Sequence, residues 1–465
     1  MIFPGTAKCL SSPIRLSFIP RENPRMHPAF STALIVGAVA AALAGMPASS
    51  ARAADLEQIY QQALANDPVY QSARYSLRAG EEKMTQGRAA ILPTVGINGS
   101  YTRSGDAMQS SVNNYTLQLT QPLLRMANWE TYRQGKLSVA VSEAQFAQAQ
   151  QDLILRVGQA YFDVLGAQDA LSFLRAQKIA ISEQLASAKR NFDVGTATIT
   201  DTNEAQARYD LANAQEIAAQ NDLEVALSKL QQIIGQPPAP LSTLRPNVQL
   251  SLPQPALIDP WISSAEQQNY GVVAQQVSLE IAQSEIKRNR AGHYPTVDLA
   301  VGRNYTNQNS QLMPYTNYRA YTNSIGVQWN IPLYSGFSVS SKVDESIALA
   351  DKARADLENA RRTAVLNARQ AYLGVSNGLS QVKAYEAAEI SSLSALESNR
   401  LGYQVGVRIN IDVLNAQQQL FSTRRDLAKA RYDTLMNGLK LKSAAGSLKE
   451  EDLAQINQLL GPPAP

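Results

Sequence analysis

The side chains that most often carry out catalysis or bind metals are scarce in this chain. Among its 465 residues are one cysteine, Cys9, and two histidines, His27 and His293. A zinc site or a Ser-His-Asp triad has almost nothing to be made from with so few histidines, and Cys9 is the only source of a thiolate. Carboxylate catalysis stays possible, but no motif supports it. We therefore predict that the protein is not an enzyme and uses no cofactor or metal.

Residues 1–53 are typical of a secretory signal peptide. Arg21 and Arg25 precede an apolar run over 29–46, and 51–53 supplies the small residues of a cleavage site. A retained membrane anchor is the alternative. We favour the signal peptide because the run is alanine-rich and shorter than the roughly 20 residues that span a bilayer.

Cleavage of this segment would remove the positive charge of the chain. The segment holds five of the 42 basic and one of the 39 acidic residues, which leaves 37 and 38 and a net charge near minus one. A nucleic-acid partner is therefore not expected. Met26 is the expected initiator. Cys9 lies before the apolar run, so lipid attachment is not expected either.

The most regular pattern in the rest of the chain is an internal repeat. Val194, Gly195, Asp201, Ala205 and Gln206 have identical counterparts 211 positions later. Self-similarity at a fixed spacing indicates a duplicated structural unit. The predicted order is a first repeat over 54–236, a proline-rich linker over 237–260, a second repeat over 261–446 and a C-terminal segment over 447–465.

Each repeat contains a long window without proline, at 123–235 and 333–461. Apolar residues recur three and four positions apart within these windows, as at Ile154, Val157 and Tyr161. The windows predict pairs of very long helices, on the order of 90 Å for a helix of about 60 residues. A long soluble coiled coil without a channel is the alternative on this pattern alone.

Each repeat also contains two segments that alternate between apolar and polar residues, within 94–123 and 296–333. Period-two alternation over about ten residues predicts membrane-spanning strands arranged as hairpins. A soluble β-sandwich fragment is the alternative. Four strands cannot close a barrel, so several chains would have to contribute to one. The aromatic residues expected to face the membrane are Tyr101, Tyr115, Tyr305, Tyr321 and Trp329.

The repeat, the strand openings Pro93-Thr94-Val95 and Pro295-Thr296-Val297, and the motif over 402–414 together resemble the TolC-like outer-membrane channel family. The resemblance implies an α+β membrane protein that forms a homotrimer, with a twelve-stranded β-barrel, four strands per chain. The barrel would lie in outer-membrane lipid and continue as a helical tunnel through the periplasm.

The resemblance also implies a function. The expected function is a passive exit duct for type I protein secretion, multidrug efflux or both, which docks with a periplasmic adaptor protein. The third partner would be an inner-membrane ABC or proton-driven transporter. Because many dedicated drug-efflux members of the family are lipidated, the absence of a lipid-bearing cysteine slightly favours the secretion or multipurpose branch. A trimeric coiled-coil scaffold or adhesin without transport is the alternative.

The resemblance further implies a gate at the periplasmic end of the tunnel. Carried over by position, Tyr403 would pair with Asp201, and Arg408 with Thr200. Asp412 from three subunits would form a ring at the constriction and attract cations.

Residues near this expected gate allow other interpretations. Asn415 stands where the best-known family pattern has an acid, which predicts weaker cation block. Gly195 and Gly406 are expected to end helices in a left-handed conformation at the tip turns. Asp201 and Asp412 could instead serve the first turn of the next helix through its dipole.

Overall fold

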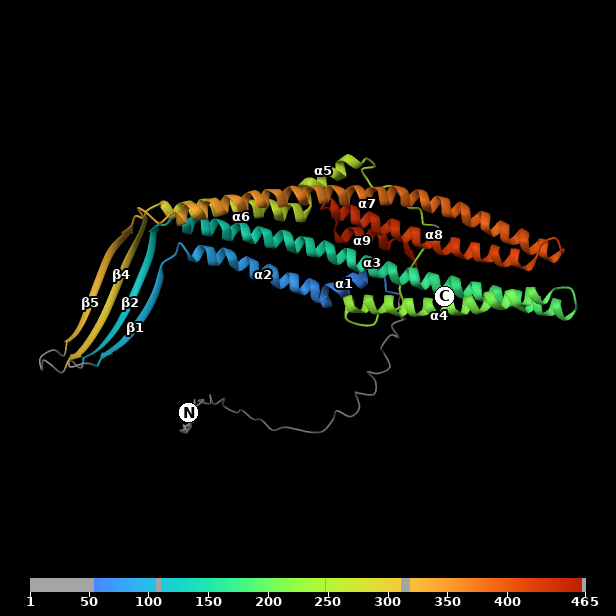
Figure 1. The fold of residues 1–465 in the computed structure, drawn as a ribbon, viewed down its shortest axis with the longest axis horizontal. Coiled ribbons are helices and arrows are strands. Elements are labelled where there is room, and N and C mark those ends of the chain that lie inside the picture. The colour runs from blue at the N-terminus through green and yellow to red at the C-terminus, as the bar shows by residue number, and fades with distance from the viewer. Residues whose placement is uncertain (1–53, 106–109, 247, 311–317, 462–465) are drawn as a thin grey trace, which may run out of the picture. The chain divides into compact units, whose positions relative to one another are not determined.

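A computed structural model describes residues 54–105, 110–246, 248–310 and 318–461. The expected signal peptide over 1–53 lies outside the described residues. Within them, an order of two helices, two strands and two long helices occurs twice (Figure 1). The mixture of long helices and strands confirms the α+β class.

The two copies have closely matching elements. The first consists of α1 (Leu56–Asn66), α2 (Pro68–Ala89), β1 (Thr94–Ser104), β2 (Ser110–Leu124), α3 (Met126–Asp193) and α4 (Ile199–Ile234). The second consists of α5 (Ile258–Gln268), α6 (Tyr270–Arg290), a 3-10 turn (Ala291–His293), β4 (Thr296–Ser310), β5 (Tyr318–Asn330), α7 (Ser338–Gln404) and α8 (Asn410–Ala444). The chain continues with α9 (Glu450–Asn457), and a small sheet pairs β3 (Thr243–Leu244) with β6 (Leu460–Gly461).

The four longer strands form one antiparallel sheet in the order β1-β2-β4-β5. The β2–β4 pair joins the first copy to the second, and β1 and β5 are its edges. Odd-numbered side chains lie on one face, which is apolar and exposed at Ile97, Leu117, Ile325 and Val327. The other face carries mostly threonine, asparagine, glutamine and glycine.

Small residues bring the long helices together. Helices α3 and α7 have 68 and 67 residues, which corresponds to about 100 Å each. On α4, Ala205, Ala212, Ala219 and Ala226 are buried and recur every seven positions. A seven-residue repeat keeps one narrow seam against a neighbour and is typical of left-handed supercoils. A similar series on α7 consists of Ala350, Leu357, Ala364 and Ala371.

The largest apolar core lies around the middle of α3. It combines side chains from α1, α3, α4, α8 and α9, among them the fully buried Tyr161 and Leu230. The Tyr161 hydroxyl donates to the carbonyl oxygen of Ser242 at 2.6 Å, and so attaches the linker between the copies to α3. None of the helices in the described ranges is apolar enough over a sufficient length to cross a membrane.

Candidate functional site

The two turns that join the paired helices, over 194–198 and 405–409, have the same backbone. Gly195 and Gly406 have φ angles of 78° and 79°, in the left-handed region that glycine adopts without a steric penalty. Their N–H groups donate to the carbonyl oxygens of Phe192 and Tyr403. The duplicated sequence therefore folds into a duplicated turn.

The helices that follow these turns begin differently. Thr198 and Asp201 form a reciprocal capping box at the start of α4, in which the Asp201 carboxylate accepts from the Thr198 N–H at 3.0 Å. Helix α8 begins after Ile409, which has no side-chain cap. Its acidic residue, Asp412, lies 3.7 Å from the Arg408 guanidinium. Asp201 thus caps the start of its own helix, whereas Asp412 lies near Arg408 of the preceding turn.

Within one chain, the expected gate residues have partners other than those carried over from the family. The hydroxyl of Tyr403 accepts from the Asn191 side chain at 3.2 Å, and Arg408 has its ion pair with Asp412. Thr200 is exposed in the first turn of α4. The pairs of Tyr403 with Asp201 and of Arg408 with Thr200 stay predictions.

A buried asparagine that the sequence analysis missed connects the two tips. Asn410, the first residue of α8, is only 2% exposed. Its Nδ2 donates to the carbonyl oxygen of Asp201 at 3.4 Å, and its Oδ1 accepts from Gln184 on α3. A buried amide needs such partners because an unsatisfied one is costly. The signal in the sequence was an uncharged polar residue between two isoleucines, Ile409-Asn410-Ile411.

A second missed residue, Arg208 on α4, reaches the face of α8. Its guanidinium donates to Oε1 of Gln418 at 2.9 Å and to Oδ1 of Asn415 at 3.1 Å. Asn415 therefore has a partner in the first repeat. The two repeats are connected near the tips by Asn410 and Arg208, and by apolar contact of Leu414 with the cluster around Ile181.

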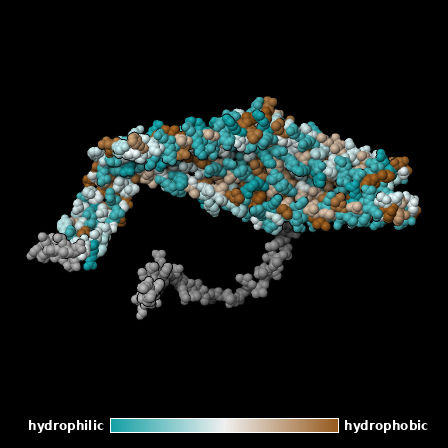
Figure 2. Space-filling model, in the orientation of Figure 1, coloured by the Kyte–Doolittle hydropathy of each residue, from teal (hydrophilic) through white to brown (hydrophobic). Residues whose placement is uncertain are grey.

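The tip turns also expose apolar side chains. Val194 and Ile199 are exposed in the first repeat, and Val405, Val407 and Ile409 in the second. Hydrophobic surface is visible at this end of the helices in Figure 2. Exposed apolar clusters on an otherwise polar helical surface are typical of contact sites for another protein.

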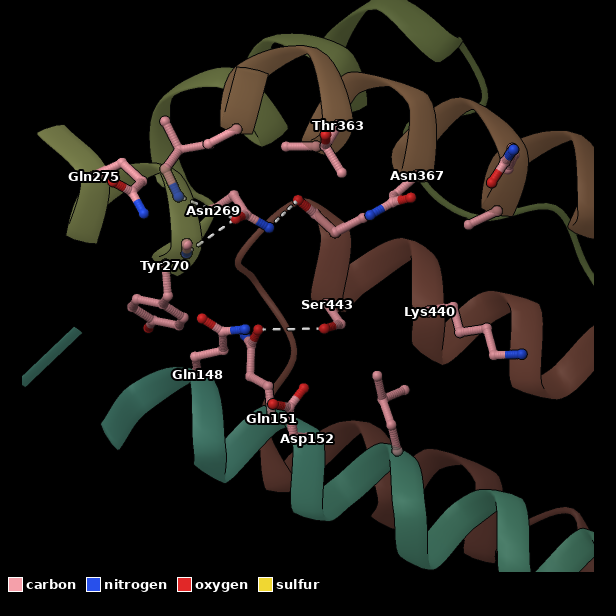
Figure 3. A pocket seen from close by; sticks show the side chains of 18 of the residues that line it. Gln148, Gln151, Asp152, Asn269, Tyr270, Gln275, Thr363, Asn367, Lys440 and Ser443 are labelled. Atoms are coloured by element: carbon pink, nitrogen blue, oxygen red, sulfur yellow. Dashed lines mark hydrogen bonds between the residues drawn. The ribbon is translucent and has the colours of Figure 1, made fainter. Parts of the chain in front are cut away.

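A polar cavity of about 740 Å³ lies where α8 ends and α6 begins (Figure 3). Asn269 caps α6 and also donates to the carbonyl oxygen of Ala444, while Ser443 donates to Gln151 at 3.4 Å. Asp152 lines the cavity, and burial raises its pKa. The described residues contain no cluster of ligands for a metal ion. These contacts make the cavity a polar junction between helices of the second copy and α3.

A second buried polar pair lies farther along α3. The Tyr432 hydroxyl on α8 donates to the Asp169 carboxylate at 2.6 Å. Burial raises the pKa of both groups. The pair fixes α8 against α3 between the cavity and the tips.

The junction between the sheet and the helices is held by one ion pair. Arg125 precedes α3 and forms two hydrogen bonds to the Asp298 carboxylate of β4, at 2.8 and 2.5 Å. Bidentate pairs of this kind fix orientation as well as distance. The pair thereby connects β4, the first strand of the second repeat, to α3, the first long helix of the first repeat.

Three of the five expected membrane-facing aromatic residues form one row across the sheet. Tyr115, Tyr305 and Tyr321 are in register, with ring centroids 6.2 and 4.9 Å apart. Tyr101 lies on the same face one row nearer the hairpin tips, and Trp329 lies at the opposite end. Both are exposed.

Comparison with known proteins identifies relatives along most of the chain. The family model "Outer membrane efflux protein" matches residues 59–236 and 261–447. Outer membrane protein TolC of Escherichia coli is 33% identical over 89% of this chain and 87% of its own length. The proteases secretion protein PrtF of Dickeya chrysanthemi is 32% identical over 88% of this chain and 91% of its own length.

Solved structures have the same fold at lower identity. VceC, an outer membrane protein of Vibrio cholerae, gives a TM-score of 0.73 at 18% identity, over 84% of this chain and 96% of that one. The CmeC outer membrane channel of Campylobacter jejuni gives 0.74 at 16% identity, over 87% and 90%. The resemblance drawn from the repeat and the turn motif is confirmed: this chain belongs to the outer membrane efflux protein family and is an outer-membrane protein.

Proposed function

We propose that three copies of this chain form a passive exit duct whose β-barrel lies in the outer membrane and whose helices extend into the periplasm. The unpaired edges β1 and β5 carry this proposal. An unpaired strand edge in hydrocarbon leaves backbone groups unsatisfied at several kcal/mol each, so β5 of one copy pairs with β1 of the next. Three copies give twelve strands, enough to leave a water-filled interior.

The tip turns are the gate of this duct. Asn410 and Arg208 hold the tips of the two repeats together through polar contacts, and the Arg408–Asp412 pair lies within its own turn. Exposed ion pairs are each worth about 0–1 kcal/mol, so a partner that binds the tips can open them. That partner is a periplasmic adaptor with its inner-membrane transporter. It would bind the apolar residues exposed at the turns.

The names of the relatives favour polypeptides over drugs as the exported cargo. Two proteins named for protease secretion, PrtF and AprF of Pseudomonas aeruginosa, are 32% and 33% identical to this chain. Proteins named for efflux, BepC of Brucella suis and TtgC of Pseudomonas putida, are 26% and 22% identical. The TolC proteins, at 32% to 34%, carry no substrate in their names. Secretion is therefore the first cargo to test, and drug efflux the second.

Planar-bilayer recording tests the duct. The purified protein is expected to give small single-channel conductance, and Arg408→Ser or Tyr403→Phe is expected to raise it by loosening the tip. Arg361→Ser, an exposed position on α7 away from the tip, is the matched control and should leave conductance unchanged. A coiled-coil scaffold without a pore would give no conductance with any of these variants.

A further inference from the structure

Three arginines lie on the apolar face of the sheet and not on the opposite face, where polar residues dominate. Arg103, Arg303 and Arg319 all occupy odd positions, the positions of the exposed apolar side chains. The described strands contain these three arginines and no others, and all three are exposed. The one carboxylate of those strands, Asp298, lies on the other face and is paired with Arg125.

The register places these arginines around the tyrosine row. Arg303 is paired with Leu117 and lies one row toward the helices from Tyr305 and Tyr321. Arg319 lies one row toward the hairpin tips, opposite Asn307. Arg103 lies one row farther, opposite Ser111. The cationic side chains thus bracket the aromatic row at one end of the apolar band.

The side chain of Arg303 lies toward this row. Its guanidinium carbon is 5.2 Å from the centroid of the Tyr321 ring, within the range of a cation–π contact. Long cationic side chains on a lipid-facing surface extend toward the interface in this way. A charge on such a face is costly at the middle of the bilayer and costs little near the interface.

We propose that Arg103, Arg303 and Arg319 bind the phosphate groups of membrane lipids in the leaflet nearer the hairpin tips. Charge complementarity supports this occupant, because the described strands offer three cations and no acid on that face. Arginine binds phosphate through paired N–H donors, and the tyrosine row positions the site at headgroup depth. The inference rests on the proposed insertion of the sheet into the outer membrane.

The test compares lipids retained by the purified channel. Wild-type protein and an Arg103→Gln, Arg303→Gln, Arg319→Gln triple variant are reconstituted in a phosphate-free galactolipid with equal traces of a phosphorylated glycolipid and its dephosphorylated form. Mass spectrometry of the detergent-extracted protein measures which form is retained. Each arginine near a charged surface should contribute about fivefold, so enrichment of the phosphorylated form should fall steeply in the triple variant. Arg361→Gln on α7 is the matched control.

Bilayer conductance separates failure of the site from failure of the duct. A triple variant that conducts and still enriches the phosphorylated lipid overturns the site and leaves the duct intact. Equal retention of the phosphorylated and dephosphorylated forms by the wild-type protein would also overturn the site. Absence of insertion by the wild-type protein would overturn both.

Discussion

Arg208 on α4 donates a hydrogen bond to Oδ1 of Asn415 on α8, at 3.1 Å, and so connects the two repeats close to their tips. The donor comes from the first repeat and the acceptor from the second. Asn415 is exposed and Arg208 is half-buried at the surface, so the contact is individually weak. A gate that must open in response to a partner needs contacts of this strength.

Arg208→Gln is expected to increase the fraction of time that the channel spends in a high-conductance state. The change shortens the side chain and removes its charge, and with them the bonds to Asn415 and Gln418. Loss of about 1 kcal/mol would shift a two-state equilibrium about fivefold. Single-channel recording in planar bilayers measures that fraction.

Arg175→Gln is the matched control for this variant. Arg175 pairs with Glu216, and both belong to the α3–α4 pair of the first repeat. Its removal leaves the connection between the repeats intact and should not change gating. Equal effects of the two substitutions would contradict a gating role for Arg208.

Asp412→Asn is expected to weaken block of the channel by divalent cations, because it would remove the carboxylates of the ring expected at the constriction. Asn415→Asp should strengthen block only modestly, since the new carboxylate would lie beside Arg208. Adding Arg208→Gln to Asn415→Asp should strengthen block further. The concentration of divalent cation that halves single-channel current measures each effect, and an undiminished block in Asp412→Asn would refute the ring.

The elements of the fold were predictable because each has a local pattern. Period-two alternation identified the strands that begin at Thr94 and Thr296, and proline-free windows identified α3 and α7. The connections between repeats had no such pattern. Asn410 meets Gln184 and Asp201 across more than 200 positions of sequence, and that contact depends on how two helix pairs pack.

Within one chain, Asp201 caps its own helix, and the sequence contains a local pattern for that role. Thr198 and Asp201 have the spacing of a capping box, and the structure forms that box. The same spacing in the second repeat joins Ile409 to Asp412, and isoleucine cannot cap a helix. Within one chain, the Asp201 carboxylate is therefore engaged in a capping bond, and the Asp412 carboxylate is not.

Asn410→Ala is expected to destabilise the tip by about 1–3 kcal/mol, because it leaves Gln184 and a backbone carbonyl without their buried partner. Amide hydrogen exchange in the first turns of α4 and α8 should speed up by a factor of about five or more. Gln419→Ala, at an exposed position on the same helix whose side chain donates to Thr423 of that helix, is the control. Similar exchange in both variants would show that burial of Asn410 is unimportant.

Arg156→Gln is expected to destabilise the middle of the helices at neutral pH. Arg156 donates to both oxygens of Asp67, which caps α2 and is 2% exposed. Burial alone would raise the pKa of Asp67, but the hydrogen bonds from Arg156 and from the Tyr70 N–H outweigh it and lower that pKa. The loss should be about 1–3 kcal/mol, since hydrogen bonds to a charged group are worth this much.

The same pair predicts how stability changes with pH. A lowered pKa of Asp67 gives a contribution that is complete above the ordinary value of about 4 and is lost as pH falls through the lower folded value. Without Arg156, two of the interactions that lower the pKa of Asp67 are lost, so the variant should lose less stability than the wild type as pH falls. The gap between the thermal midpoints of wild type and Arg156→Gln should therefore narrow as pH falls from about 6 to about 3. A gap that stays constant across this range would mean that Arg156 acts through packing, because a packing contact does not depend on the charge of Asp67.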